Sequence, residues 1–292
     1  MQEEAKNDGQ LDCKVVRGLA DEMQSSIATA VRTLDDLLNF DKIQTGTFRL
    51  ELGVVRMCDL IDHIVKEYQL VADEKQISLC HHRLFGDDSD NDVEAPYQFG
   101  DEKLVVIGDS IRLAQVVRNL VSNSFKFTPK GGNITIETRL RDGPSHSEEK
   151  FKLATGEEIV VPRHGNITVN VVDSGVGMTQ DQLANLFQEG RQFNANKLLN
   201  GKGSGLGLYI SKGIVNQHHG RLLASSGGLE VGGSTFSIEL PLYEVNEEIR
   251  MVTQRRSHLF GRSGAAGQRK SNCNSWRLYN ACTARSCSAR IV

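Results

Sequence analysis

Two asparagines and a lysine occupy the segment NLVSNSFK, at Asn119, Asn123 and Lys126. Their spacing of four and three residues predicts that all three lie on one face of a helix. An amide oxygen can bind Mg²⁺, and an ammonium group can neutralise a phosphate. Because polar stripes are common on exposed helices, this segment alone favours a solvated surface over a site.

The segment VVDSGVGMT places a carboxylate and two glycines where a strand-like run ends. Gly175 and Gly177 permit a sharp turn and a close approach of the backbone to a ligand. Asp173 can accept a hydrogen bond from an exocyclic amine such as the adenine N6. The D-x-G-x-G pattern alone also fits any tight turn.

The glycine-rich segment GKGSGLGL runs from Gly201 to Leu208 and leads into a predicted helix. Free N–H groups at a helix start, together with the helix dipole, form an anion site. The segment lacks the P-loop pattern and does not follow a strand, as a dinucleotide-binding loop does. It follows the polar loop EGRQFNANKLLN, which fits a lid over a nucleotide; a flexible linker is the alternative.

The elements that must position these segments follow from hydrophobic periodicity. We expect an α+β fold, a two-layer sandwich with helices on one face of a mixed sheet. Residues 141–165 read as an inserted loop or an extra hairpin, and GDDSDNDVE as a solvated acidic loop. Strands are predicted at 48–52, 77–84, 133–140, 166–173, 221–226 and 234–242. Helices are predicted at 19–45, 58–75, 109–127 and 180–187, and a last helix follows the glycine-rich segment and ends at Gln217.

The first predicted helix carries an apolar stripe that steps by three or four residues. A single helix with such a stripe needs a partner. The pattern fits a dimerising hairpin arm and equally a helix packed on its own domain. The stripe consists of Met23, Ile27, Val31, Leu34 and Leu38.

Composition excludes several classes of protein. The 292 residues are 39% hydrophobic, and the longest apolar runs fall short of the roughly 18–20 residues that cross a membrane. No secretory signal begins the chain, so we expect a cytoplasmic protein or the cytosolic part of a membrane-anchored parent. None of the six cysteines forms a C-x-x-C pair, which favours reduced thiols over a zinc or redox site.

The net charge of −3 is unevenly distributed. From Ile249 onward there are eight Arg and one Lys and no acidic residue, which leaves −12 on the rest of the chain. An acidic body argues against nucleic-acid binding.

Together, the three segments resemble the ATP-binding catalytic domain of hybrid sensor histidine kinases. This domain belongs to a larger group shared with gyrase B, Hsp90 and MutL. RLAQVVRNLVSNSFKFTPKGG resembles the N box, VVDSGVGMT the G1 box, LF the F box, GKGSGLGLYISKGIV the G2 box and GGSTFSIELPL the G3 strand. The resemblance covers roughly 48–242, and DLLNFDKIQTG is similar to the end of the second helix of a dimerisation hairpin.

The resemblance implies ATP and Mg²⁺ as cofactors and a Bergerat-type ATP fold. Asn123 would bind the metal, Asn119 and Lys126 the phosphates, and Asp173 the adenine amino group. The other residues implied in nucleotide binding are Phe127, Gly175, Gly177, Phe187, Lys202, Gly203, Ser204, Gly205, Leu206, Gly207, Leu208 and Thr235.

Position 119 separates the classes within this group. The ATPase relatives carry a glutamate there, four residues before the metal asparagine, as a general base for water. Asn119 cannot remove a proton. We therefore expect the site to hold ATP without efficient hydrolysis and to transfer the γ-phosphate to a nucleophile brought from outside.

The acceptor histidine of an S-H-E-L-R-T-P-like H box is not found in this sequence. The chain would then be a fragment, or a kinase that acts in trans, with a receiver domain as partner. The histidines are His63, His81, His82, His146, His164, His218, His219 and His258, with His219 matched to the HG turn of the family.

The expected organisation has four parts. A polar segment (1–18) precedes a partial dimerisation helix (19–47), and the ATP-binding catalytic domain (48–245) precedes a basic, disordered tail (246–292). The tail fits either a partner-binding segment or, as the favoured interpretation, a non-native reading frame.

Three functions remain open at this point. The main hypothesis is a histidine kinase of a two-component phosphorelay, active as a homodimer. The second is a non-catalytic ATP-sensing module, or pseudokinase, that regulates a partner. The third, ranked lower, is a serine kinase of the mitochondrial dehydrogenase-kinase type.

Overall fold

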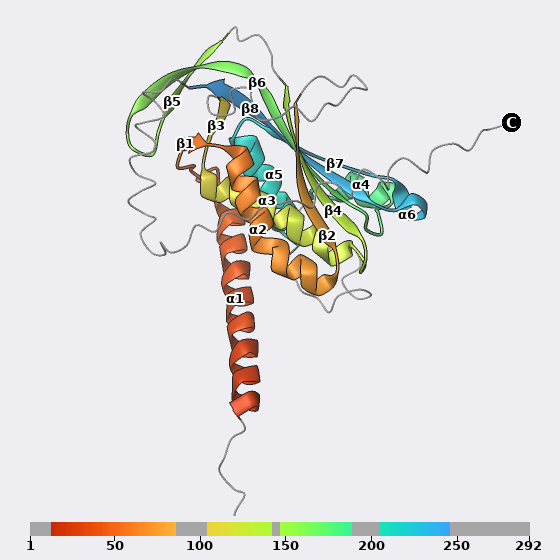
Figure 1. Ribbon diagram of the computed structural model, residues 1–292. Helices are drawn as coiled ribbons and strands as arrows, with labels where there is room; N and C mark the ends of the chain where they lie inside the picture. The colour runs from red at the N-terminus through yellow and green to blue at the C-terminus, as the bar shows by residue number, and fades with distance from the viewer. Residues whose placement is uncertain (1–12, 86–103, 142–146, 189–204, 246–292) are drawn as a thin grey trace, which may run out of the picture. The chain divides into compact units, whose positions relative to one another are not determined.

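The computed structural model describes residues 13–85, 104–141, 147–188 and 205–245 (Figure 1). The predicted acidic loop, the basic tail and the positions Lys202, Gly203 and Ser204 lie outside these ranges. In the described part of the chain, no helix combines the length and the apolar character that crossing a membrane requires.

A mixed sheet forms one layer of the fold. Its strands follow the order β1-β3-β8-β6-β4-β2, with β5 paired to β6 and β7 paired to β8. β2 and β4 are parallel, and the other pairs in the described ranges are antiparallel. The strands are β1 (Gly53–Val55), β2 (Ser78–Phe85), β3 (Leu104–Gly108), β4 (Asn133–Arg141), β5 (Glu148–Lys152), β6 (Glu158–Asp173), β7 (Arg221–Ser226) and β8 (Ser234–Glu244).

Helices cover one face of this sheet, as the sequence predicts. Figure 1 shows α2 (Met57–Lys75), α3 (Ser110–Phe127) and α5 (Gly207–Gln217) on the same side of the strands. α3 contacts β4 and β6, while α2 packs on β2 and α5 on β7. Two short helices, α4 (Gln180–Asn185) and α6 (Gly228–Val231), complete the domain. The α+β sandwich is confirmed.

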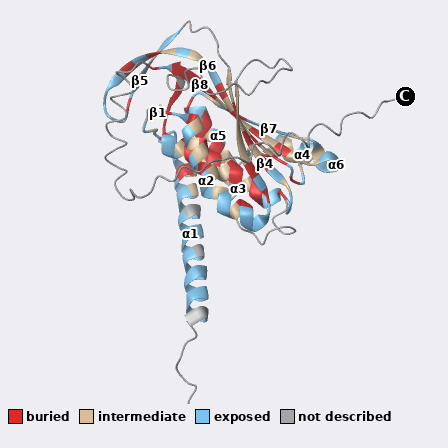
Figure 2. Cartoon of the chain, viewed as in Figure 1, coloured by how far each residue is buried: buried red, intermediate tan, exposed pale blue. Residues whose placement is uncertain are grey.

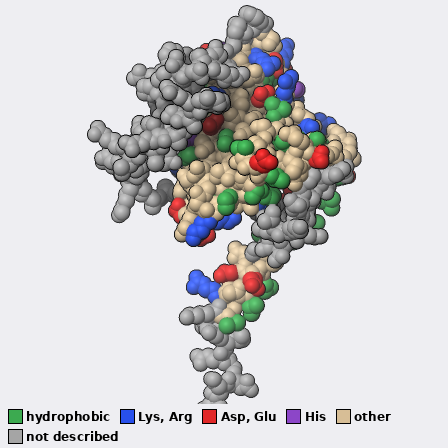
Figure 3. Space-filling model, turned by 90° about the vertical axis from the view of Figure 1, so that its right-hand side faces the viewer, with side chains coloured by type: hydrophobic (Ala, Val, Ile, Leu, Met, Phe, Trp, Pro, Cys, Tyr) green, Lys and Arg blue, Asp and Glu red, His purple; other side chains and the backbone are tan. Residues whose placement is uncertain are grey.

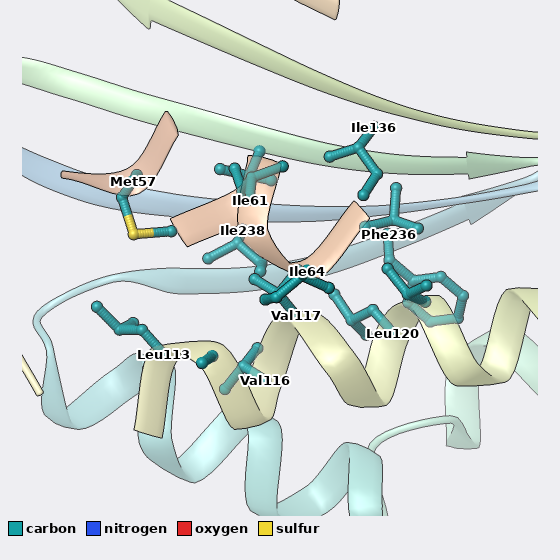
Figure 4. Close-up of a cluster of buried hydrophobic side chains, with 14 of the residues drawn as sticks. Met57, Ile61, Ile64, Leu113, Val116, Val117, Leu120, Ile136, Phe236 and Ile238 are labelled. Atoms are coloured by element: carbon teal, nitrogen blue, oxygen red, sulfur yellow. The ribbon is translucent and has the colours of Figure 1, made fainter. Parts of the chain in front are cut away.

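The core lies between the helices and the sheet. Figure 4 shows that α2 and α3 direct their apolar faces at one another and toward β4 and β8. Burial of these side chains is the main favourable contribution to folding, at about 25 cal/mol per Å² of apolar surface. The labelled core residues are Met57, Ile61, Ile64, Leu113, Val116, Val117, Leu120, Ile136, Phe236 and Ile238.

Residues 147–161 form the extra hairpin that was one of two predictions for this region. β5 pairs with the first part of β6, and Phe151 packs edge-on against Tyr243 with ring centroids 5.0 Å apart. Tyr243 donates a hydrogen bond of 2.8 Å to Glu149, and burial raises the pKa of its phenol. The hairpin takes part in a second apolar cluster. Its members are Leu153, Ile159 and Val161 of the hairpin together with Val105, Ile107, Tyr243 and Val245.

The strand predicted at 48–52 is wrong. Its backbone finds other partners: Glu51 N–H donates to the Asp109 carboxylate at 3.0 Å, and Leu52 C=O accepts from Ala154 at 2.8 Å. The adjacent residues of β1 pair with β3 instead. β3 itself, an apolar run in the sequence, was not among the predicted strands.

The first helix, α1 (Cys13–Gln44), begins earlier than the predicted residue 19. Its C-terminal end packs on α5, where Phe40 and Tyr209 rings lie 5.4 Å apart and Gln44 donates to the Tyr209 hydroxyl at 3.0 Å. The preceding turns are exposed (Figure 2), and Figure 3 shows apolar beside charged side chains on this helix. The C-terminal end of α1 thus packs on its own domain, whereas the apolar stripe is exposed, and the dimerising role of this helix stays a prediction.

Candidate nucleotide-binding site

The start of α3 is fixed by Asp109. Its Oδ1 accepts hydrogen bonds of 3.1 Å from the N–H groups of Ile111 and Arg112, which caps the helix. The Asp109 N–H in turn donates to His218 Nε2 at 2.9 Å, at the C-terminal end of α5. The helix that carries the asparagines is thus anchored to α5.

Asn119 faces the first turn of α5. Its Nδ2 donates to Ser211 Oγ at 3.0 Å. A Cβ on Gly207 would lie 2.7 Å from Asn119 Oδ1, so a larger residue at position 207 would displace this amide. The structure therefore brings the N box and the G2 box into direct contact.

The remaining residues of the asparagine stripe lie towards the C-terminal end of α3. Asn123 is half-buried, and Lys126 is exposed. Phe127 is 41% exposed, so this aromatic residue is not enclosed by the core. Its carbonyl accepts from Val176 N–H at 3.3 Å, so the G1 turn lies against this end of α3.

Asp173 ends β6 and is 5% exposed. Ser124 donates to its Oδ2 at 3.2 Å, and the Gly175 N–H donates to its Oδ1 at 2.9 Å. Burial raises the pKa of the Asp173 carboxyl, while the hydrogen bonds from Gly175, Ser124 and Ser234 oppose that rise. The site therefore holds a buried acceptor next to the asparagine helix.

The turn after Asp173 depends on Gly177. It has φ of +74°, and a Cβ there would meet the carbonyl of Gly228. Thr235 lies on β8 in register with Val172, on the strand next to Asp173. Gly175, Gly177 and Thr235 therefore lie around the end of β6, and their role in nucleotide binding stays a prediction.

The start of α5 is described from Gly205 onward. Gly205 has φ of +72°, and Leu206 precedes the helix without a side-chain capping hydrogen bond. Leu208 packs against the main core. Backbone N–H groups of a first helical turn have no intrahelical partner, so the start of α5 has donors of the kind that an anion site requires.

Phe187 of the predicted F box lies beside α5 rather than beside Asp173 in the described contacts. It is half-buried on the core, and the Lys212 ammonium lies 5.3 Å from its ring centroid. Its assignment to nucleotide binding stays a prediction.

Three serines in these contacts were missed by sequence reasoning. Ser124, Ser211 and Ser226 each donate or accept within the site, and their partners are distant in the sequence. Serine follows no periodic pattern, so the only available signal was the position of Ser124 directly after Asn123.

Two adjacent histidines end α5, and they differ. His218 is 3% exposed, accepts from Asp109 N–H, and donates through Nδ1 to the Ile214 carbonyl at 2.8 Å. Burial lowers the pKa of His218. His219 is exposed and has φ of +58°. The contacts of His218 are those of a structural residue, and whether either histidine accepts phosphate stays a prediction.

The fold and the site define a class of protein: an α+β ATPase-like domain with an asparagine helix, an Asp-Gly turn and a glycine-rich helix start. Residues 108–244 match the family model described as "Histidine kinase-, DNA gyrase B-, and HSP90-like ATPase". Residues 108–244 therefore form a domain of this family, which includes a histidine kinase branch.

Two relatives that are named as histidine kinases support the histidine kinase branch of this family. Hybrid signal transduction histidine kinase D of Dictyostelium discoideum is 28% identical, over 79% of this chain and 14% of its own length. Histidine kinase 5 of Arabidopsis thaliana is 31% identical, over 78% of this chain and 23% of its own length. The chain thus spans less than a quarter of these two proteins.

Solved structures share the fold. Full-length ShkA in complex with AMPPNP is 20% identical and gives a TM-score of 0.56, covering 82% of this chain and 41% of ShkA. Histidine kinase ThkA in complex with the response regulator protein TrrA is 18% identical, with a TM-score of 0.50 over 80% of this chain and 53% of that one.

Proposed function

We propose that this chain binds Mg-ATP and transfers the γ-phosphate to a histidine carried by another segment or another chain. One observation carries the proposal. α3, which bears Asn119 and Asn123, directly contacts both the Asp173 turn and the start of α5. Groups suited to metal, base and phosphate recognition are thereby gathered around one helix.

Asp173 is the group proposed to select adenine. A carboxylate only accepts hydrogen bonds, so it favours the N6 amine of adenine over the O6 carbonyl of guanine. Its oxygens are already oriented by Ser124 and Gly175, which reduces the reorganisation needed on binding. The exposed Phe127 would provide an apolar surface beside the base.

Asn123 is the residue proposed to hold Mg²⁺. Magnesium keeps several waters and commonly binds one or two protein oxygens together with the phosphates of its nucleotide. An amide oxygen fits this chemistry, and Lys126 lies three residues further on the helix. The ion would neutralise the charge of the phosphates during transfer.

Asn119 supports transfer rather than hydrolysis. Its amide cannot act as a general base, and its Nδ2 is engaged by Ser211. Transfer would break the bond between the γ-phosphorus and the bridging oxygen, while a bond from the phosphorus to the acceptor nitrogen forms and ADP leaves. Positioning and charge neutralisation would supply most of the catalysis.

Two partners follow from this proposal. The exposed apolar stripe of α1 supports a homodimer, in which two such helices cover one another. A receiver domain would take the phosphate from the acceptor histidine, as in a phosphorelay. Nucleic acid is not an expected partner, because the chain outside the basic tail is acidic.

The test is transfer of label from [γ-³²P]ATP to a separately supplied hairpin that carries an H-box histidine. We expect acid-labile, alkali-stable label on the hairpin, and none when Asn123 is replaced by Ala. Nucleotide binding without transfer would instead support the regulatory module, and acid-stable label would support a serine kinase.

A further inference from the structure

Ser226, the last residue of β7, connects three segments through its hydroxyl. Its Oγ accepts hydrogen bonds from the N–H groups of Met178, at 2.9 Å, and Gly228, at 3.3 Å. It donates to the Gly233 carbonyl at 2.6 Å. Met178 closes the turn that follows Asp173, whereas Gly228 begins α6 and Gly233 follows it. One side chain therefore joins two turns that are about fifty residues apart in the sequence.

Backbone contacts reinforce this junction. The Gly233 N–H donates to the Gly175 carbonyl at 2.7 Å. The absence of a side chain at Gly177 allows the Gly228 carbonyl to approach closely. The turn 174–178, which we name the base turn, thus packs against residues 227–233, and Ser226 lies where they meet.

We propose that Ser226 is a positioning residue for the adenine base. This inference rests on the proposed binding of ATP. Ser124 and Gly175 orient the Asp173 carboxylate, whereas Ser226 fixes the base turn that follows it. Recognition of N6 requires Asp173 and the base turn to keep a constant separation.

The effect should be confined to the base. The phosphate-binding groups proposed above lie on α3 and at the start of α5. The hydrogen bonds that Ser226 makes within the described residues go to Met178, Gly228 and Gly233 instead. Removal of the hydroxyl leaves two N–H groups and one carbonyl without this partner and lets the two turns separate. Affinity for the triphosphate should persist while discrimination between bases declines.

The experiment compares Ser226→Ala with the wild-type chain by titration calorimetry with Mg-ATP and with Mg-GTP. We expect the Kd for ATP to rise about three- to tenfold, as loss of a hydrogen bond implies, with little change for GTP. The ratio of the two affinities is the readout, because a loss of folded protein would weaken both nucleotides equally and leave the ratio unchanged.

Two further variants complete the design. Ser226→Thr keeps the hydroxyl and should restore the ratio. Ser225→Ala alters an exposed neighbour on β7 and should leave both affinities unchanged. An unchanged ratio in Ser226→Ala, with or without a lower Tm, would overturn the positioning role. Failure of the wild-type chain to bind ATP would instead remove the proposed function, and this inference with it.

Discussion

Asn119 donates a hydrogen bond of 3.0 Å to Ser211, which joins the asparagine helix α3 to the glycine-rich start of α5. The resemblance to the ATPase relatives matches this residue to the position of their glutamate. The contact thus replaces a potential general base with a structural link between two parts of the candidate site.

A base can be restored at this position. We expect Asn119→Glu to raise steady-state ATP hydrolysis at least about tenfold, because a general base typically contributes a hundredfold or more to such a step. Ser211 can donate to the new carboxylate, so the link to α5 should survive. Phosphate release from Mg-ATP measures the effect.

The matched control is Asn119→Gln, which has the size of glutamate without its basicity. Equal rates for the Gln and Glu variants would show that the side chain at position 119 does not determine whether ATP is hydrolysed.

The ionisation of Asp173 predicts a pH dependence of nucleotide binding. Burial raises the pKa of this carboxyl, and its charged form accepts a stronger hydrogen bond from N6 than its protonated form does. ATP affinity should therefore be highest at pH values well above the raised pKa and should decrease as the pH falls through it. This decrease should begin at a higher pH than it would for an aspartate with the ordinary pKa. Ser124→Ala removes a donor that lowers the pKa and should move the midpoint to higher pH.

Calorimetric Kd values at a series of pH values test this prediction. Protonation of ATP itself affects the wild type and Ser124→Ala equally. The difference between the midpoints of these two proteins therefore reports on Asp173. Asp173→Asn should bind ATP weakly and lack this transition. A Ser124→Ala midpoint at or below that of the wild type would contradict the assignment.

His218 predicts a loss of stability in acid. Its Nε2 must be unprotonated to accept from Asp109, and burial lowers the pKa of the ring. The folded state thus binds fewer protons than the unfolded state. The free energy of unfolding should be constant above the ordinary histidine pKa of about 6.5 and fall as the pH decreases below it.

Urea unfolding at pH 7.5 and 5.5 measures this loss. In His218→Gln the decrease between these pH values should become smaller, because glutamine does not titrate. His219→Gln changes an exposed neighbour and should keep the wild-type decrease. The same decrease in both variants would assign the acid sensitivity to other groups.

The exposed stripe of α1 predicts self-association. Ile27, Val31 and Leu34 are 60%, 52% and 60% exposed, which is costly for apolar side chains in water. We expect Ile27→Glu to convert a dimer into a monomer in sedimentation equilibrium. Thr29→Glu, on the opposite face of the helix, should remain dimeric. A monomeric wild-type chain would contradict the proposed homodimer.

The sequence by itself determined most elements and the residues of the candidate site. Periodicity predicted α2 and α3 because their apolar faces repeat at helical spacing, and alternation predicted β2 and β7. The asparagine stripe and the D-x-G-x-G turn were visible because each depends on local spacing. The proposed boundaries of the domains and the roles of the site residues stay predictions.

Only the tertiary structure decided how these parts meet. The hydrogen bonds of Ser124, Ser211 and Ser226 join residues that are distant in the chain, and no local pattern encodes such pairs. The segment 48–52 alternates like a strand, yet its backbone bonds to Asp109 and Ala154. Long-range partners override local propensity in these places, because a polar backbone group is stabilised by whichever partner the fold brings to it.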